Sequence, residues 1–153
     1  MPEINDEYWM QKAICLAKTA EQINEVPVGA VIVKDNKIIG RGFNLMITSN
    51  DSSAHAEIQA LRDAGKNLQN YRIVDSTLYV TLEPCMMCVG AMIHARINRL
   101  VFGAYDHKTG MIITQDKCLD KSYHNHKIES LGGVLETECA QLLREFFKKR
   151  RNN

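Results

Sequence analysis

The stretch TLYVTLEPCMMCVGAMIHA, residues 77–95, decides the fold of this chain. Its first six residues are apolar, aromatic or β-branched, and they predict a buried strand over 77–82. Pro84 then stands where a helix begins, a position at which the N–H that proline lacks would have no helical partner. The apolar residues that follow extend this helix to about Ala95. A buried strand that leads directly into a helix favours an α/β domain.

Strands and helices continue in both directions from this stretch. Asp6 is expected to cap the first helix, and Gly65 is expected to end the second. Residues 105–126 have no clear period and are predicted to form a loop, long enough to suggest a functional role. We predict helices over 6–24, 54–64, 84–95 and 136–149, and strands over 28–33, 38–43, 77–82 and 99–104. This order predicts a layered α/β domain with helices on both faces of the sheet.

The composition indicates one globular domain over residues 1–153. Of the 153 residues, 45% are hydrophobic and 24% are charged, which excludes a disordered or fibrous chain. No apolar run is long enough to cross a bilayer, so no membrane partner is expected. The N-terminus lacks the basic and apolar regions of a signal peptide, which predicts a cytoplasmic location. Five cysteines without a signal peptide favour reduced thiols over a disulfide framework.

Charge is nearly balanced along the chain. Lys and Arg number 19, Asp and Glu number 18, and the formal net charge is +1. This argues against a uniformly basic nucleic-acid binder, although a local basic patch is compatible with it. The last helix supplies such a patch in Lys148, Lys149, Arg150 and Arg151. These side chains either contact RNA phosphates or form a solvated helix end that complements the helix dipole.

Two short motifs contain the residue types of a metal site. His55 and Glu57 stand at the start of the second predicted helix, and Cys85 and Cys88 in the first turn of the third. Two thiolates and one imidazole are a good donor set for zinc, and three ligands leave the fourth tetrahedral position to water. Glu57 follows His55 by two residues and so lies near the metal without being a natural ligand. A carboxylate there could accept a proton from the metal-bound water and pass it on.

The Cys-x-x-Cys pair has other readings. It could be a redox motif or half of a structural zinc site, but no second pair completes such a site, and His124 and His126 are a poor match to zinc-finger spacing. The ligand set therefore favours a catalytic zinc. Cys15 and Cys139 fall on predicted apolar helix faces and are expected in the core, as are Leu142, Leu143, Phe146 and Phe147 of the last helix. Cys118 has no predicted role.

His-x-Glu followed by Pro-Cys-x-x-Cys is the signature of the zinc-dependent nucleobase deaminases. The chain resembles this superfamily, and it is similar over nearly its whole length to the bacterial tRNA-specific adenosine deaminases. The segments that carry this second resemblance are residues 26–31, 42–44, 55–58, 78–85, 90–94, 101–104, 106–110, 125–126 and 142–147. The segments 106–110 and 125–126 are the ones that favour the tRNA branch.

The resemblance implies a fold, a reaction and a set of site residues. The fold would be a three-layer α/β/α cytidine-deaminase-like domain with a mixed central sheet. The reaction would be hydrolytic deamination of the wobble adenosine of a tRNA anticodon to inosine, by hydroxide formed on zinc, in a cytoplasmic homodimer that binds the anticodon stem-loop. One Zn²⁺ per chain would be held by His55, Cys85 and Cys88, with Glu57 as proton shuttle. Asn44 and the backbone of Ala56 would contact the base, Val28 would wall the pocket, and Asp106 would contact a neighbouring ribose.

Three questions stay open at this level. The same zinc motif occurs in free-base deaminases that act on guanine or cytosine, and the low net charge slightly favours these. A catalytically idle zinc module that only binds RNA or a partner is a further alternative, which Glu57 opposes. Met86, Met87, Met92 and Ile93 form either ordinary core or part of a subunit interface.

Overall fold

A five-stranded mixed sheet forms the centre of the computed structural model, which describes residues 3–152. Its strands stand in the order β2-β1-β3-β4-β5. Strand β1 pairs antiparallel with both β2 and β3, whereas β3, β4 and β5 are parallel. The strands are β1 (Gly29–Lys34), β2 (Lys37–Phe43), β3 (Thr77–Leu82), β4 (Arg99–Ala104) and β5 (Glu129–Leu131). The predicted mixed sheet is confirmed.

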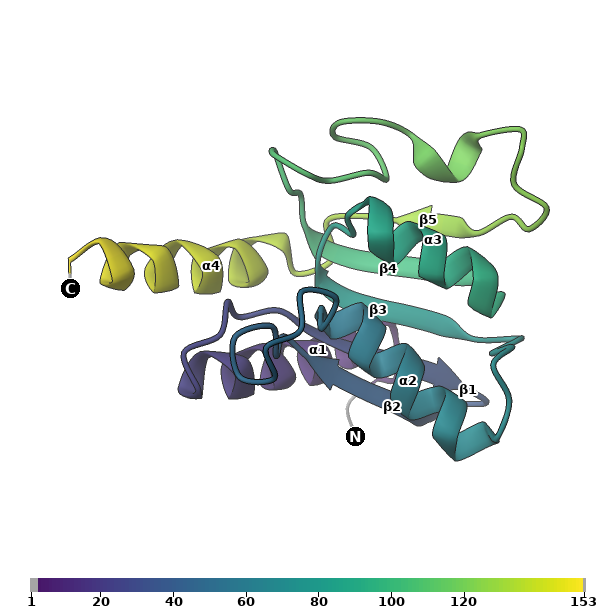
Figure 1. The fold of residues 1–153 in the computed structure, drawn as a ribbon, viewed down its shortest axis with the longest axis horizontal. Coiled ribbons are helices and arrows are strands. Elements are labelled where there is room, and N and C mark those ends of the chain that lie inside the picture. Colours follow the sequence, from purple (N-terminus) through teal and green to yellow (C-terminus); the bar gives the residue numbers. More distant parts are fainter. Residues whose placement is uncertain (1–2, 153) are drawn as a thin grey trace.

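Helices cover both faces of this sheet, as predicted (Figure 1). Helices α1 (Asp6–Gln22) and α4 (Glu136–Arg151) pack on one face, and α2 (Ala56–Leu68) and α3 (Met86–Ala95) pack on the other. Strand β1 shows why two layers form, because side chains alternate along a strand. Ala30 and Ile32 lie in the core under α2 and α3, whereas Val31 and Val33 lie in the core with α1. Within residues 3–152, none of the helices has the length and apolar character of a membrane span.

Strand direction brings the starts of two helices together. Because β2 and β3 are both antiparallel to β1, they run in the same direction, and their last residues lie at the same end of the sheet. Helix α2 follows β2, and α3 follows β3. Both helices therefore begin at that end of the sheet, which is where His55, Cys85 and Cys88 lie.

Two predicted helix ends were wrong. The cap of α1 is Asn5, whose side chain accepts a hydrogen bond from the Tyr8 N–H at 3.0 Å, so Asp6 is the first helical residue. Helix α2 continues through Gly65 and ends at Leu68, where Gln69 takes the left-handed conformation. One glycine inside a helix costs only about 1 kcal/mol, which the packed alanines of α2 outweigh.

The fifth strand and the long loop also differ from the prediction. The loop after β4 contains a short 3₁₀ turn, Cys118–Asp120, and β5 follows it. Strand β5 has three residues, all exposed, and pairs with β4 at the sheet edge. A strand that buries no side chain has no hydrophobic period, so the sequence carried no signal for it.

Several predicted core residues are exposed. Cys15 is exposed because α1 buries a stripe of alanines, and Cys15 lies away from that stripe. Cys139 is buried, as predicted. In α4 only Cys139 and Phe146 are buried, and Phe147 is 42% exposed. Figure 1 shows the reason, since the second half of α4 extends beyond the sheet.

Candidate functional site

The two motifs lie next to each other at the end of the sheet where α2 and α3 begin. His55 is the residue before α2, Cys85 is the residue before α3, and Cys88 is the third residue of α3. The Nδ1 atom of His55 lies 3.6 Å from the Sγ atom of Cys85 and 3.6 Å from the Sγ atom of Cys88. The three candidate ligand atoms all lie within 4.8 Å of one another. This group could hold a metal ion.

The distances fit zinc. A tetrahedral ion with Zn–N of about 2.0–2.1 Å and Zn–S of about 2.3 Å separates nitrogen and sulfur ligands by about 3.6 Å. The thiol of Cys88 and the ring of His55 lower the pKa of Cys85 to about 4, against the effect of burial. The Cys85 thiolate and burial together raise the pKa of Cys88. The cluster thus already favours one thiolate, which is the form that binds a cation.

Glu57 lies beside this group in the first turn of α2. Its side chain is 4% exposed. Burial raises the pKa of Glu57 to about 7, although the nearby His55 opposes the shift. A carboxyl group with a pKa near neutrality can both accept and donate a proton at physiological pH. The role of Glu57 as proton shuttle stays a prediction, with which its burial and its pKa are compatible.

A cavity of about 520 Å³ opens beside the cluster. Six of the predicted site residues line it, namely Val28, Asn44, His55, Glu57, Cys85 and Asp106. Cys88 and Ala56 are fully buried and are not among the residues that line the cavity. The remaining wall consists of Val26, Met46, Leu82, Glu83, Tyr105, His107, Lys108, Thr109, Leu143 and Phe147. The volume is typical of a site for a small organic group such as a nucleobase.

Asn44 and Ala56 form a hydrogen bond with each other in this structure. The Oδ1 atom of Asn44 accepts from the Ala56 N–H at 2.9 Å, and its Nδ2 atom donates to the Val26 carbonyl at 3.1 Å. One hydrogen of the Asn44 amide is left over. The predicted base contacts of the two residues stay predictions, and the Ala56 N–H would have to be shared with Asn44 in order to contact a base.

Asp106 organises the turn at the mouth of the cavity. Its Oδ1 atom accepts from the N–H groups of Lys108 and Thr109 at 3.0 and 3.1 Å, and its Oδ2 atom from the Thr109 hydroxyl at 2.9 Å. A short side chain that bonds the backbone two and three residues ahead is typical of a stable turn. The carboxylate is thus directed at its own loop, and its ribose contact stays a prediction.

Two buried carboxylates near the cavity were missed in the sequence. Glu25 is fully buried and accepts from the N–H groups of Ile47 and Thr48. Glu83 is 2% exposed and accepts from the loop after β4. Burial raises the pKa of each group, but the hydrogen bonds outweigh it and lower the pKa below the ordinary value. The only feature of the sequence that could have indicated Glu83 is its position, because Glu83 follows a buried strand and directly precedes Pro84.

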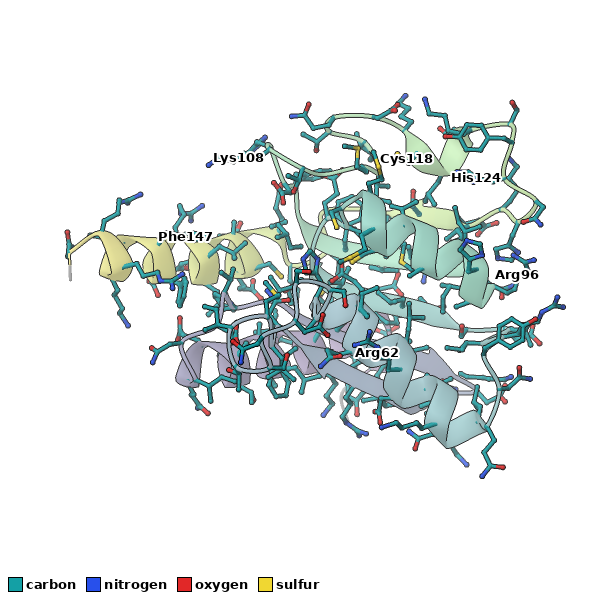
Figure 2. The ribbon with its side chains drawn as sticks, viewed as in Figure 1. Arg62, Arg96, Lys108, Cys118, His124 and Phe147 are labelled. Atoms are coloured by element: carbon teal, nitrogen blue, oxygen red, sulfur yellow. The ribbon has the colours of Figure 1, made fainter. Side chains whose placement is uncertain are left out.

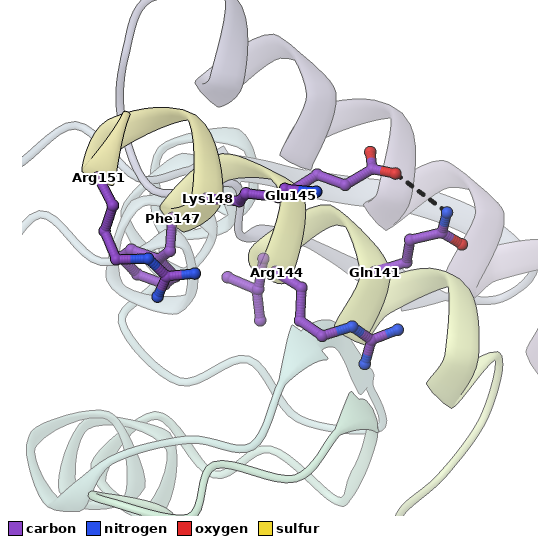
Figure 3. A pocket seen from close by; sticks show the side chains of 7 residues that line it. Gln141, Arg144, Glu145, Phe147, Lys148 and Arg151 are labelled. Atoms are coloured by element: carbon purple, nitrogen blue, oxygen red, sulfur yellow. Dashed lines mark hydrogen bonds between the residues drawn. The ribbon is translucent and has the colours of Figure 1, made fainter. Parts of the chain in front are cut away.

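Helix α4 extends the cavity wall into a basic surface. A shallow groove of about 560 Å³ runs along α4 and is lined by that helix alone, as Figure 3 shows. Leu143 and Phe147 belong to both this groove and the cavity. Lys108, labelled with Phe147 in Figure 2, forms a further hollow with Phe147, Arg150 and Arg151. The mouth of the cavity is therefore continuous with a basic, partly apolar helix face.

Known proteins that are similar to this chain are deaminases. The family model of the MafB19-like deaminases matches residues 4–151. The tRNA-specific adenosine deaminase of Haemophilus influenzae is 56% identical over 147 residues, which cover 95% of this chain and 85% of that protein. A solved structure from a study of A-to-I editing by tRNA:A34 deaminases at the wobble position is 39% identical, with a TM-score of 0.86, and the match covers 89% of this chain and 99% of that chain.

A more distant likeness concerns the fold alone. The guanine deaminase from Nitrosomonas europaea has a TM-score of 0.78 and covers 95% of this chain and 86% of its own, but is only 23% identical. The family model and the high identities lead to one conclusion: the chain belongs to the MafB19-like deaminases and to the family of tRNA-specific adenosine deaminases.

Proposed function

We propose that this chain is a hydrolase that converts the wobble adenosine of a tRNA anticodon to inosine and releases ammonia. One observation carries the proposal. The buried carboxyl group of Glu57 and the His55, Cys85 and Cys88 cluster lie together at one cavity. The 56% identity to a tRNA-specific adenosine deaminase supports tRNA as the substrate. We further propose that residues 1–153 act as a single deaminase domain.

We propose that His55, Cys85 and Cys88 hold one Zn²⁺ per chain. When bound, such an ion lowers the pKa of a water ligand toward about 7 and so makes a nucleophile available at neutral pH. Glu57 would take the proton of the attacking water on its carboxylate. It would deliver this proton to the ring nitrogen of the base, and it would then carry a second proton, from the hydroxyl group added to the base carbon, to the leaving amine. Its pKa of about 7 supports both halves of this transfer.

The remaining site residues would hold the base. Val28 would pack against the ring, and Asn44 and the backbone of Ala56 would hydrogen-bond to it. Asp106 would contact the ribose of a neighbouring nucleotide at the mouth of the cavity. The target base must leave its stack to enter, which costs less for a nucleotide in an anticodon loop than for a paired one. The basic α4 would approach the phosphates of the stem-loop.

We also propose that the chain works as a homodimer in the cytoplasm, where tRNA is found. Met92 and Ile93 of α3 are buried, whereas Met86 and Met87 at its start are 65% and 39% exposed. Ile113 is exposed in the adjoining loop, whose Met111 N–H bonds to the Pro84 carbonyl at 3.0 Å. Large exposed apolar side chains near one another are typical of an interface. We expect twice the mass of one chain in solution.

Incubation with total tRNA, followed by sequencing of adenosine-to-inosine changes, tests the reaction. We expect inosine only at the wobble position and ammonia release from tRNA. Guanine, cytosine and free adenosine serve as competing substrates, because the free-base alternative predicts ammonia from one of them. A protein that binds tRNA but releases ammonia from none of the four would be the idle module instead.

A further inference from the structure

The Glu83 carboxylate binds the loop that forms one wall of the cavity. Its Oε1 atom accepts from the Asp106 N–H at 3.1 Å and from the Thr114 hydroxyl at 2.5 Å. Its Oε2 atom accepts from the N–H groups of Ile112, Ile113 and Thr114 at 3.1, 2.9 and 3.0 Å. All five donors belong to residues 106–114. One buried side chain thus holds both ends of this loop.

Within residues 3–152, no basic side chain forms an ion pair with this carboxylate. Among the described residues, the ion pairs are Arg62–Asp51, Arg99–Asp6 and Lys121–Asp116. The loop donors are therefore the polar partners of Glu83, and a buried acceptor that loses its donors is costly. The loop also needs the carboxylate, because the four backbone N–H groups that face it have no other acceptor in their own chain segment.

Gly110 allows the loop to close on this carboxylate. A Cβ atom at Gly110 would lie 2.4 Å from Oε1 of Glu83 and 2.6 Å from the Asp106 carbonyl oxygen. The Gly110 N–H donates to that same carbonyl at 3.0 Å. Next along the chain, the Met111 N–H donates to the Pro84 carbonyl at 3.0 Å. The loop is thus joined to the segment that leads into Cys85.

Between the two anchors lie the residues that face the cavity. His107, Lys108 and Thr109 line it and are exposed. Glu83 is two residues from Cys85 in the chain, so its hydrogen bonds connect this wall with the metal-binding end of the cavity.

We propose that Glu83 is a positioning residue for the deamination, which sets the place of residues 106–109 relative to His55 and Cys85. This inference rests on the proposed function and extends it to how the substrate is held. Glu83 acts through the loop and does not touch the reacting atoms. Its loss should therefore weaken the productive placement of the RNA more than it slows the proton transfers at Glu57.

The variant Glu83→Gln tests this with one atom changed. The amide oxygen can serve the three N–H groups of residues 112–114, but the NH₂ group then faces the Asp106 N–H, donor against donor. We expect the KM for tRNA to rise about tenfold, with kcat changed by less than about threefold and zinc content unchanged. Gly110→Ala, which crowds the same oxygen, should give the same pattern. The double variant should be little worse than either, because both break one contact.

The matched control is Asp116→Asn, which removes an exposed carboxylate two residues beyond the end of this loop. It should leave KM and kcat unchanged. If Glu83→Gln lowers kcat at constant KM, loses zinc, or behaves like Asp116→Asn, the positioning role is wrong. If Glu83→Gln does not fold, Thr114→Val, which removes one of the five hydrogen bonds, should still raise KM about twofold to threefold.

Hydrogen exchange separates this inference from the proposed function. The amides of residues 106 and 112–114 should be protected in the wild-type protein, and the amide of Asp106 should lose protection in Glu83→Gln. An unprotected Asp106 amide in the wild-type protein would overturn the anchor whatever the activity. A wild-type protein that deaminates no tRNA would refute the proposed function, while the exchange data would still decide whether Glu83 holds the loop.

Discussion

Glu57 is the residue on which the proposed chemistry depends most directly. Glu57→Gln keeps the shape of the side chain but cannot accept a proton. We expect inosine formation to fall by about 10⁴-fold, the upper end of what general acid–base catalysis contributes, because one group serves several transfers. Zinc content and tRNA affinity should stay close to the wild-type values, since no ligand or phosphate contact is removed. Single-turnover rates, metal analysis and a binding assay measure the three quantities.

Glu129→Gln serves as the control, because Glu129 is an exposed carboxylate on β5. It should leave all three quantities unchanged. Loss of zinc from Glu57→Gln would make Glu57 a ligand or a structural group. Substantial remaining activity would mean that another residue is the base.

A substitution at Cys88 tests the proposed metal site directly. Cys88→Ala leaves only His55 and Cys85, and two protein ligands hold zinc far less tightly than three. We expect the purified variant to contain much less than one zinc per chain. Cys15→Ala is the matched control, because Cys15 is an exposed cysteine outside the cluster. Retention of full zinc in Cys88→Ala would remove Cys88 from the ligand set.

At the scale of elements, glycines on β2 let α2 approach the sheet. A Cβ atom at Gly42 would lie 2.2 Å from the Ala56 carbonyl oxygen and 2.4 Å from the Ala60 nitrogen. Gly42→Ala must therefore push the start of α2, and His55 with it, away from β2. We expect the free energy of unfolding to fall by about 1–3 kcal/mol in denaturant titrations, as for other overpacked cores.

The control lies in the same helix. At Gly65 a Cβ atom would make only an ordinary contact, 3.5 Å from the Asn70 carbonyl oxygen. Gly65→Ala should raise the free energy of unfolding by about 0.5–1 kcal/mol, because alanine is the better helix former. Equal effects of the two alanines would contradict the close-packing argument.

Helix α4 supplies the basic surface that we propose binds RNA. If Lys148, Lys149, Arg150 and Arg151 contact phosphates, the slope of log affinity against log salt should flatten by about 0.7–0.9 for each lost contact when they are replaced by alanine. The control removes four positive charges at the end of the sheet that lies opposite the cavity, at Lys34, Lys37, Lys66 and Arg72. An unchanged slope in the first variant, or equal flattening in both, would leave α4 as a solvated helix end.

The sequence predicted the elements that bury side chains and missed those that do not. Strands β1 to β4 and all four helices stand within a few residues of their predicted places, because their buried side chains appear in the sequence as continuous apolar runs or as apolar residues at a regular spacing. Strand β5 buries nothing and was missed. The metal cluster was predicted because its residue types are rare in combination. Glu83 was missed because its role comes from five donors 23 to 31 residues further along, which only the fold brings together.

At the scale of the whole molecule, Asp6 joins the first helix to the centre of the sheet. Its carboxylate forms two hydrogen bonds with Arg99 of β4, at 2.8 and 2.7 Å, and accepts a third from the hydroxyl of Tyr79 on β3 at 2.8 Å. The hydrogen bonds from Arg99 lower the pKa of Asp6 below its ordinary value of 3.8, against partial burial. Three elements distant in the sequence are thus held by one ion pair at the end of the sheet opposite the cavity.

This ion pair should make the free energy of unfolding depend on pH in a defined window. Because the pKa of Asp6 is lower in the folded chain than in the unfolded chain, the contribution of Asp6 to stability is complete above the ordinary value of 3.8 and is lost as pH falls through the folded value.

We expect Asp6→Asn to lower the free energy of unfolding by about 1 kcal/mol at pH 7, a typical value for a partly exposed pair. The difference between the two proteins should shrink below about pH 4. Both proteins keep His55, Cys85 and Cys88, so the acid sensitivity of this group cancels in that difference. Denaturant titrations from pH 3 to 7 measure it, with the exposed Asp120→Asn as the control that should show no difference at any pH. A difference between wild type and Asp6→Asn that stays constant to pH 3 would mean that the carboxylate charge is not what joins α1 to β3 and β4.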